Sequence, residues 1–286
     1  MKVAVVGYAS LDYVVRIDSA PRPDRTSTVL SRAAEWPRLG GSPAYIAAAL
    51  IAGGVGDAIP ISWVGDDSEG ERYRASLARL GVRADGIGVR AGRTPVCILA
   101  YEPNGGCDCL FDPGLESEAE LDDAQRALIA SASAVCVTVG PAGAVREALA
   151  LARRQAAIAW VVKADPRAFP PDLAVALANH ASVVIFNRGE ATFVKEALSQ
   201  GKGPAGGRIL VETRGRKEVE VLENGRVELI PVNEVKADDP TGAGDAFAGG
   251  FLAAWLPRRD AAAAAKAGAA AARELLQART RPAPAG

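Results

Sequence analysis

The chain has 286 residues, of which 49% are apolar, and its 33 Lys and Arg residues nearly balance its 34 Asp and Glu residues. This composition is sufficient for a large packed core, and the even charge without a long basic run excludes the electrostatic footprint of a nucleic-acid-binding protein. No segment approaches the ~20 consecutive apolar residues of a membrane span, and the amino terminus is typical of a first strand rather than a signal peptide. We therefore expect a soluble, cytoplasmic protein whose partners are small molecules, with no nucleic acid and no membrane among them.

Short β-branched runs alternate with alanine-rich helical runs along most of the chain. The alternation predicts a three-layer α/β/α fold, in which a mostly parallel central sheet is covered by helices on both faces. No repeat or change of composition marks a second unit, so residues 1–286 are expected to form one domain. The predicted strands are 2–7, 61–65, 134–139, 158–164, 182–186 and 208–213, and the predicted helices are 42–53, 68–80, 142–154, 172–178, 188–199 and 260–278.

Two segments, 11–36 and 94–111, interrupt the strand–helix alternation. Both have the composition of antiparallel strands, and in the second the Asn104-Gly105 pair lies between two strand-like runs. Asn-Gly is the strongest short-range signal for a hairpin turn. We expect these segments to form a small antiparallel sheet that projects from the body as a lid.

The four cysteines and the single histidine argue against two kinds of chemistry. Cys97, Cys107, Cys109 and Cys136 lack the paired C-x-x-C spacing of a structural zinc site, which favours reduced thiols packed as small apolar groups. His180 follows an alanine-rich helical run, and one histidine gives little support to Ser-His-Asp or Cys-His catalysis.

Glycines lie at the predicted start of a helix in the string DPTGAGD, residues 239–245. A glycine inside a helix costs about 0.5–1 kcal/mol relative to alanine, so a compensating function is expected. The first turn of a helix exposes N–H groups without intrahelical partners at the positive end of its dipole, and glycines let a phosphate approach them. Asp245 is then placed to accept a proton from an attacking hydroxyl. The alternative is a tight turn with a capping aspartate.

The string 239–245 resembles the D-[TP]-T-G-A-G-D signature of the ribokinase-like, PfkB-type carbohydrate kinases. The resemblance extends over nearly the whole chain, because further segments match in order. These are GYASLD (7–12), GGSPAYIAAAL (40–50), NRGE (187–190) and TRG (213–215).

The resemblance implies roles for residues at the matching positions. Asp245 would be the catalytic base, and the backbone N–H groups of Gly242, Ala243 and Gly244 would bind the phosphate as an anion hole. Substrate would be bound by Asp12, Gly40, Gly41 and Tyr45, together with Asp245. Mg²⁺ would be organised, usually through water, by Asn187 and Glu190. Nucleotide would be bound by Thr213, Gly215, Gly242, Gly244 and Asn187.

Two positions depart from the family pattern. Tyr45 replaces a substrate-binding asparagine, and a phenol can stack on a flat ring but cannot copy the donor–acceptor pair of a carboxamide. Glu218 replaces a glycine that is common beside the nucleotide. Asp12 and Glu190 also have structural interpretations, as a turn residue and as a residue stabilised by a helix dipole.

Together these patterns predict an ATP- and Mg²⁺-dependent kinase that phosphorylates a hydroxyl of a small sugar, ribose-like or fructose-like. A nucleoside kinase of the adenosine type is the close alternative, since Tyr45 favours a substrate with an aromatic base, and a catalytically silent sugar-binding regulator is a further one. A dinucleotide-dependent oxidoreductase would need G-x-G-x-x-G after the first strand, and residues 7–12 lack it. The resemblance also suggests a homodimer formed through the lid. The acceptor and any dependence on a monovalent cation stay open.

Overall fold

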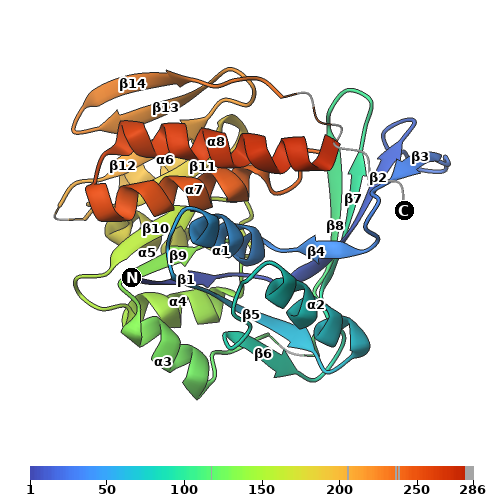
Figure 1. Ribbon diagram of the computed structural model, residues 1–286, viewed down its shortest axis with the longest axis horizontal. Coiled ribbons are helices and arrows are strands. Elements are labelled where there is room, and N and C mark those ends of the chain that lie inside the picture. Colours follow the sequence, from blue (N-terminus) through green and yellow to red (C-terminus); the bar gives the residue numbers. More distant parts are fainter. Residues whose placement is uncertain (117, 205, 236, 238, 281–286) are drawn as a thin grey trace.

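A nine-stranded sheet forms the centre of the computed structural model, which describes residues 1–116, 118–204, 206–235, 237 and 239–280 (Figure 1). Its strand order is β14-β13-β12-β11-β10-β9-β1-β5-β6, parallel from β12 to β6 and antiparallel at β13 and β14. The strands are β1 Lys2–Val6, β5 Asp57–Gly65, β6 Ile87–Arg90, β9 Ala134–Val137, β10 Ala157–Val161, β11 Val183–Asn187, β12 Ile209–Thr213, β13 Glu218–Glu223 and β14 Arg226–Pro231.

Helices cover both faces of this sheet and enclose two separate apolar cores. Strand β1 shows how the chain supplies both, because Val3 and Val5 belong to one core while Ala4 and Val6 belong to the other. The first core is covered by α1 Ser42–Ala52, α2 Ser68–Arg79, α7 Ala243–Arg258 and α8 Ala261–Thr280, and the second by α3 Asp123–Ser131, α4 Ala142–Leu151, α5 Pro171–His180 and α6 Ala191–Gln200. The predicted three-layer fold is confirmed.

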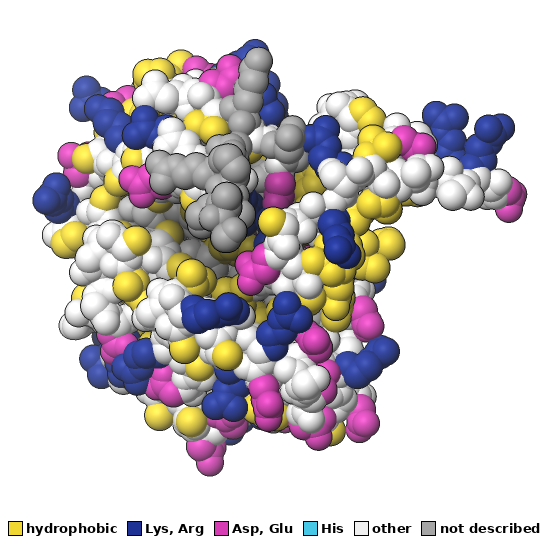
Figure 2. All heavy atoms as spheres, turned by 45° about the vertical axis from the view of Figure 1, so that its right-hand side comes forward, with side chains coloured by type: hydrophobic (Ala, Val, Ile, Leu, Met, Phe, Trp, Pro, Cys, Tyr) yellow, Lys and Arg dark blue, Asp and Glu magenta, His cyan; other side chains and the backbone are white. Residues whose placement is uncertain are grey.

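The predicted lid is a second sheet, which stands out from the body (Figure 1 and Figure 2). Its strands are β2 Ser10–Ile17, β3 Val29–Arg32, β4 Arg38–Gly40, β7 Val96–Tyr101 and β8 Cys107–Asp112. The pairings are antiparallel except for β2 and β7, which run parallel, and the sheet extends past the predicted end at residue 36 to include β4. The turn between β7 and β8 contains Asn104 and Gly105, and Gly105 has a φ of 91°. We call these five strands the lid sheet.

Some elements were not predicted from the sequence. Helix α3 follows a capping box, in which Asp122 and Gln125 satisfy each other's backbone N–H groups, and this pattern is visible in the sequence. The antiparallel strands β13 and β14 were missed as well, because they lie outside the strand–helix alternation. The short strand β6, which follows α2 and pairs parallel with β5, was also missed. The single predicted domain includes residues 281–286, which lie outside the described part of the chain. None of the described helices is both long and apolar enough to cross a membrane.

Candidate active site

The predicted site residues gather at the edge of the central sheet where its parallel strands end. Asn187 and Thr213 are the last residues of β11 and β12 and pair with each other in register. Gly7 follows β1, and α7 begins at Ala243 beside this edge. Open α/β sheets bind ligands at the carboxyl ends of their strands, so the topology alone brings distant segments to one place.

The start of α7 has the backbone geometry that its glycine predicts. Gly242 is the N-cap residue, and its φ of 77° is in the left-handed region that favours glycine. Ala243 N–H donates to Pro240 O at 3.0 Å, whereas no bond from the Gly242 or Gly244 N–H to a backbone acceptor occurs within the described ranges. Within the described residues, Gly242 and Gly244 are thus the predicted anion-hole donors whose N–H groups have no backbone acceptor.

Asp245 lies in the first turn of α7 and is half-buried. Burial raises the pKa of its carboxyl, and the Ser42 side-chain hydrogen bond and the charges of Lys163 and Arg279 oppose that rise. A carboxylate with a raised pKa is a stronger base than an exposed aspartate. The electrostatics therefore suit the predicted proton acceptor.

Asp12 is buried in β2 at the base of the lid sheet. Its carboxylate accepts a 2.7 Å hydrogen bond from Ser10 Oγ. Burial raises the pKa of Asp12 to about 6, against the opposing effects of Ser10 and Arg38, and the charge of Asp245 raises it further. A Cβ at residue 40 would overlap the Asp12 carboxylate, which explains why a glycine stands there. Asp12 therefore lies against the Gly40 backbone and within reach of the charge of Asp245.

Gly41 and Tyr45 complete the segment that precedes and begins α1. Gly41 has a φ of 83°, and a Cβ there would collide with the carbonyl oxygen of Tyr8. The Tyr45 hydroxyl donates to Leu39 O at 2.7 Å, and its ring lies against Gly242. The hydroxyl expected to meet substrate is therefore engaged by the protein itself.

Asn187 and Glu190 form a reciprocal cap at the turn after β11. Glu190 Oε2 accepts from Asn187 N at 2.9 Å, and Asn187 Oδ1 accepts from Glu190 N at 3.2 Å. Burial raises the pKa of Glu190, although the hydrogen bond from the Asn187 backbone and the charge of Lys163 oppose the rise. Carboxylate and amide oxygens suit Mg²⁺. Within the described residues no cluster of His, Cys, Asp and Glu could hold a metal directly, so water and nucleotide oxygens would have to complete its shell.

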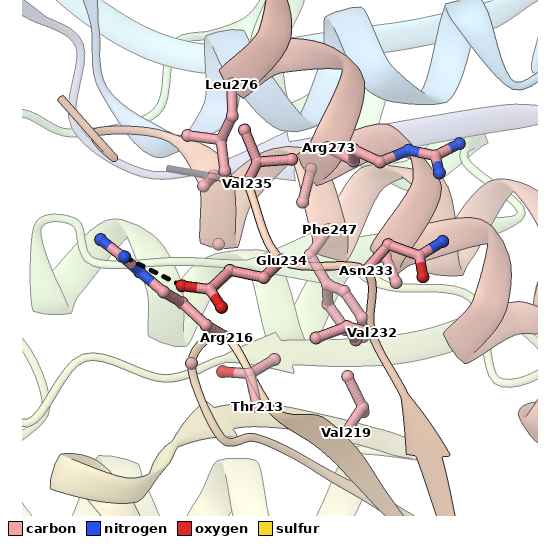
Figure 3. A pocket seen from close by; sticks show the side chains of 15 residues that line it. Thr213, Arg216, Val219, Val232, Asn233, Glu234, Val235, Phe247, Arg273 and Leu276 are labelled. Atoms are coloured by element: carbon pink, nitrogen blue, oxygen red, sulfur yellow. Dashed lines mark hydrogen bonds and ion pairs between the residues drawn. The ribbon is translucent and has the colours of Figure 1, made fainter. Parts of the chain in front are cut away.

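A cavity lies between β12, β13 and the helices α7 and α8 (Figure 3). Thr213 and Gly215, predicted to contact nucleotide, line it together with Ala243 and Gly244 from the start of α7. The apolar part of its wall and an Arg216–Glu234 ion pair of 3.1 Å at one side are visible in Figure 3. The other lining residues were not predicted to contact nucleotide, and they include Val219, Val232, Asn233, Val235, Phe247, Arg273 and Leu276.

Glu218 does not line this cavity. It lies in β13, where it receives a hydrogen bond of 3.2 Å from Arg214. Arg214 also pairs with Glu212 at 3.0 Å and Glu220 at 2.6 Å. The departure from the family pattern at residue 218 is thus one part of a charge network beside the cavity.

The lid sheet and α8 both contact the segment that leads into α7. Tyr101 Oη and Thr241 Oγ1 lie 2.7 Å apart, and Arg38 from β4 forms a two-pronged ion pair with Asp239. Arg279 from α8 reaches the same segment. Sequence reasoning missed Arg38 and Arg279, because only the folded chain brings residues 38, 239 and 279 together.

Lys163 is a further charged residue at this edge. It lies two residues beyond β10, whose Val161 pairs with Ile185, so it lies level with Asn187. Its charge acts on Asp245 and Glu190.

A family model and several known proteins are similar to this chain over most of its length. Residues 1–281 match the model of the pfkB family of carbohydrate kinases. An ATP-dependent ribose-1-phosphate kinase of Halopiger xanaduensis is 31% identical over 265 residues, which cover 91% of this chain and 86% of that protein. A nucleoside kinase of Methanothermobacter thermautotrophicus is 26% identical over 263 residues, covering 89% and 82%. The ADP complex of ribokinase from Cryptococcus neoformans shares the fold, with a TM-score of 0.79 at 20% identity over 95% of this chain and 92% of that one.

Proposed function

This chain belongs to the pfkB family of carbohydrate kinases and is an ATP-dependent kinase of a sugar or nucleoside hydroxyl, and from that premise we propose that its acceptor is a ribofuranosyl compound substituted at C1. Ribose 1-phosphate is the first candidate, because the 31% identical relative that spans 91% of this chain is named for it. A ribofuranose with C1 occupied has one primary alcohol, at C5, and we place phosphoryl transfer there. This proposal narrows the ribose-like or fructose-like sugar predicted from the sequence.

The observation that carries the proposal is the placement of two carboxylates, Asp12 in β2 of the lid sheet and Asp245 in the first turn of α7. Asp12 and Asp245 lie close enough for the charge of one to raise the pKa of the other, although burial is the larger cause at Asp12. Asp12 would accept hydrogen bonds from ring hydroxyls, assisted by the close approach that Gly40 and Gly41 allow. Asp245 would take the proton of the attacking hydroxyl.

The α7 start would then stabilise the transferred group. The Gly242 and Gly244 N–H groups are directed donors at the positive end of a helix dipole, where a phosphoryl group gains most from them. The cavity lined by Thr213 and Gly215 would hold the nucleotide next to these donors. Bound Mg²⁺, organised through water by Asn187 and Glu190, would neutralise phosphate charge.

A nucleoside is the second candidate, and a specific pocket favours it. Beside Tyr8, under the lid sheet, Trp63 and Leu115 line a largely apolar pocket that also contains Glu116 and Glu118. Two carboxylates would repel the phosphate of ribose 1-phosphate, whereas they could accept hydrogen bonds from an amino group of a base. The Tyr8 ring, which lines this pocket, lies 5.1 Å from the Phe111 ring.

An acceptor panel with ADP detection tests the proposal. Ribose 1-phosphate, ribose, fructose and the common nucleosides are each supplied with ATP and MgCl₂. We expect turnover with a C1-substituted ribofuranose, loss of turnover in Asp245→Asn, and retained acceptor binding in that variant. Turnover with free sugars alone would contradict the acceptor class. Acceptor binding without turnover of any compound would instead support the silent sugar-binding regulator.

A further inference from the structure

Arg279, in the last turn of α8, contacts the segment that leads into α7 at several points. Its Nη1 donates to the carbonyl oxygen of Thr241, lies 3.5 Å from the carbonyl oxygen of Asp239 and 3.8 Å from the carboxylate of that residue. Its Nη2 donates to Tyr45 Oη at 3.2 Å, and its guanidinium carbon lies 5.6 Å from the centre of that ring. Its side chain is only 17% exposed, so one arginine is embedded among the groups that shape the α7 start.

The contact with Thr241 fixes the direction of an anion-hole donor. Thr241 C=O and Gly242 N–H belong to one peptide unit, and in a planar trans peptide the two bonds point in opposite directions. A guanidinium that holds the carbonyl oxygen on one side therefore turns the Gly242 N–H to the other side. Gly242 has a φ of 77°, and glycine has no side chain to restrict the rotation of this peptide. The hydrogen bond from Arg279 to the Thr241 carbonyl oxygen therefore limits a rotation that Gly242 itself leaves free.

The same cation links this peptide to the lid sheet and to α1. Asp239 is shared between Arg279 and the buried Arg38 of β4, and Tyr45 of α1 supports Gly242 from beneath. Arginine suits such a position because its planar donors can satisfy several oxygens at once and it stays charged. Lysine, with one compact ammonium, could replace only part of the arrangement.

We propose that Arg279 is a positioning residue for phosphoryl transfer, which orients the Thr241–Gly242 peptide so that its N–H faces the γ-phosphate of bound ATP. The inference rests on the proposed function, since it needs a phosphate at the α7 start. It adds a residue from the far end of α8 that neither the sequence pattern nor the nucleotide cavity indicates. Arg279 itself touches the donor peptide and not the phosphate.

Nucleotide binding tests this without any acceptor. The ratio of the affinities for AMP-PNP and ADP, measured by calorimetry with MgCl₂, reports the contact with the γ-phosphate. We expect Arg279→Ala to lower this ratio by about tenfold, the size expected for one misdirected charge-assisted hydrogen bond, and Arg279→Lys to lower it less. Lys266→Ala is the matched control, because Lys266 is an exposed cation on the same helix.

Chemical rescue separates positioning from simple loss of stability. If Arg279→Ala leaves a vacant guanidinium site, millimolar guanidinium chloride should restore part of the AMP-PNP preference, and tetramethylammonium chloride at equal ionic strength should not. If the wild-type affinities for AMP-PNP and ADP were nearly equal, both the proposed anion hole and the role of Arg279 would be contradicted. If the wild type prefers AMP-PNP and Arg279→Ala keeps that preference, the role of Arg279 alone would be overturned. The same conclusion would follow if the variants lost the preference together with a fall in melting temperature and guanidinium restored the preference in neither of them.

Discussion

The ring of Tyr45 lies directly under Gly242, so that a Cβ at residue 242 would come within 3.1 Å of its Cγ and Cδ2 atoms. The residue that replaces the family's substrate-binding asparagine thus supports the turn at the α7 start, which we propose binds phosphate, instead of presenting a free hydroxyl. Its hydroxyl is engaged by Leu39 O and Arg279. We infer that Tyr45 influences the acceptor through the shape of the site more than through a hydrogen bond.

Replacing Gly242 by alanine should therefore damage both stability and turnover. The left-handed φ of 77° and the contact with the Tyr45 ring together should cost about 1–3 kcal/mol of the free energy of unfolding. Gly244→Ala is the matched control, because its Cβ would meet no atom within 4 Å. Thermal denaturation should show a lower melting temperature for Gly242→Ala only. Equal melting temperatures for the two variants would contradict the packing argument.

Asp245→Asn should lower kcat by about 10²–10⁴-fold, the usual contribution of a general base. The amide keeps the shape of the side chain but cannot accept the proton. Nucleotide affinity, measured by calorimetry, should change little, since the carboxylate is assigned to the acceptor hydroxyl. A kcat within threefold of wild type would show that another group takes the proton.

Acceptor binding should weaken in acid through Asp12. Burial raises the pKa of its carboxyl to about 6, so Asp12 is ionised and able to accept hydrogen bonds at pH 7 and is mostly protonated at pH 5. Below pH 6 the affinity for the acceptor should fall by up to about tenfold per pH unit, because only the ionised form accepts from both oxygens. Calorimetric titrations with the acceptor between pH 5 and pH 8 measure this affinity. Because no turnover takes place in them, the pH dependence of proton transfer to Asp245 does not enter the measurement.

The matched variant for this test is Asp12→Asn. It should bind the acceptor weakly at every pH, with no acidic decline. If Asp12→Asn showed the same decline as wild type, the titrating group would be a different one.

Cys109 should be the most reactive thiol of the lid sheet. Its Sγ lies 3.2 Å from Cys97 Sγ, and the hydrogen bond from Cys97 lowers the pKa of Cys109 to about 7, whereas burial raises that of Cys107. Because the thiolate is the nucleophile, iodoacetamide at pH 7 should modify Cys109 before Cys107. Peptide mass spectrometry identifies the site, and Cys97→Ala should slow the reaction. Faster labelling of Cys107 would contradict this assignment.

The proposed homodimer has a candidate surface on the lid sheet. Leu30 and Leu110 are 63% and 64% exposed on β3 and β8, which are edge strands of this sheet. Figure 2 shows hydrophobic side chains gathered where the lid joins the body. Leu110→Lys should shift a dimer to monomer in sedimentation velocity. Leu229→Lys, at a 52% exposed site on β14, is the control that should leave the dimer intact. A wild-type monomer at micromolar concentration would contradict the dimer.

The sequence by itself determined the fold class and the segments that meet at the site. Alternating β-branched and alanine-rich runs predict a sheet with two covered faces, because the periods of strand and helix place apolar side chains on fixed faces. Glycines at residues 40, 41 and 242 were informative because each marks a close approach or a left-handed backbone that the structure contains. The antiparallel strands β13 and β14 were not predicted, because no helical run separates them and the prediction relied on the alternation of strands and helices.

Only the tertiary structure decided how the site is supported. Arg38, Asp239 and Arg279 meet although about 200 residues separate the first two along the chain, and no local pattern encodes such a contact. Likewise, whether Tyr45 faces the acceptor or Gly242 depends on the packing of α1 against α7. Sequence periodicity sets which face a residue occupies, whereas the partner on that face is fixed by long-range packing alone.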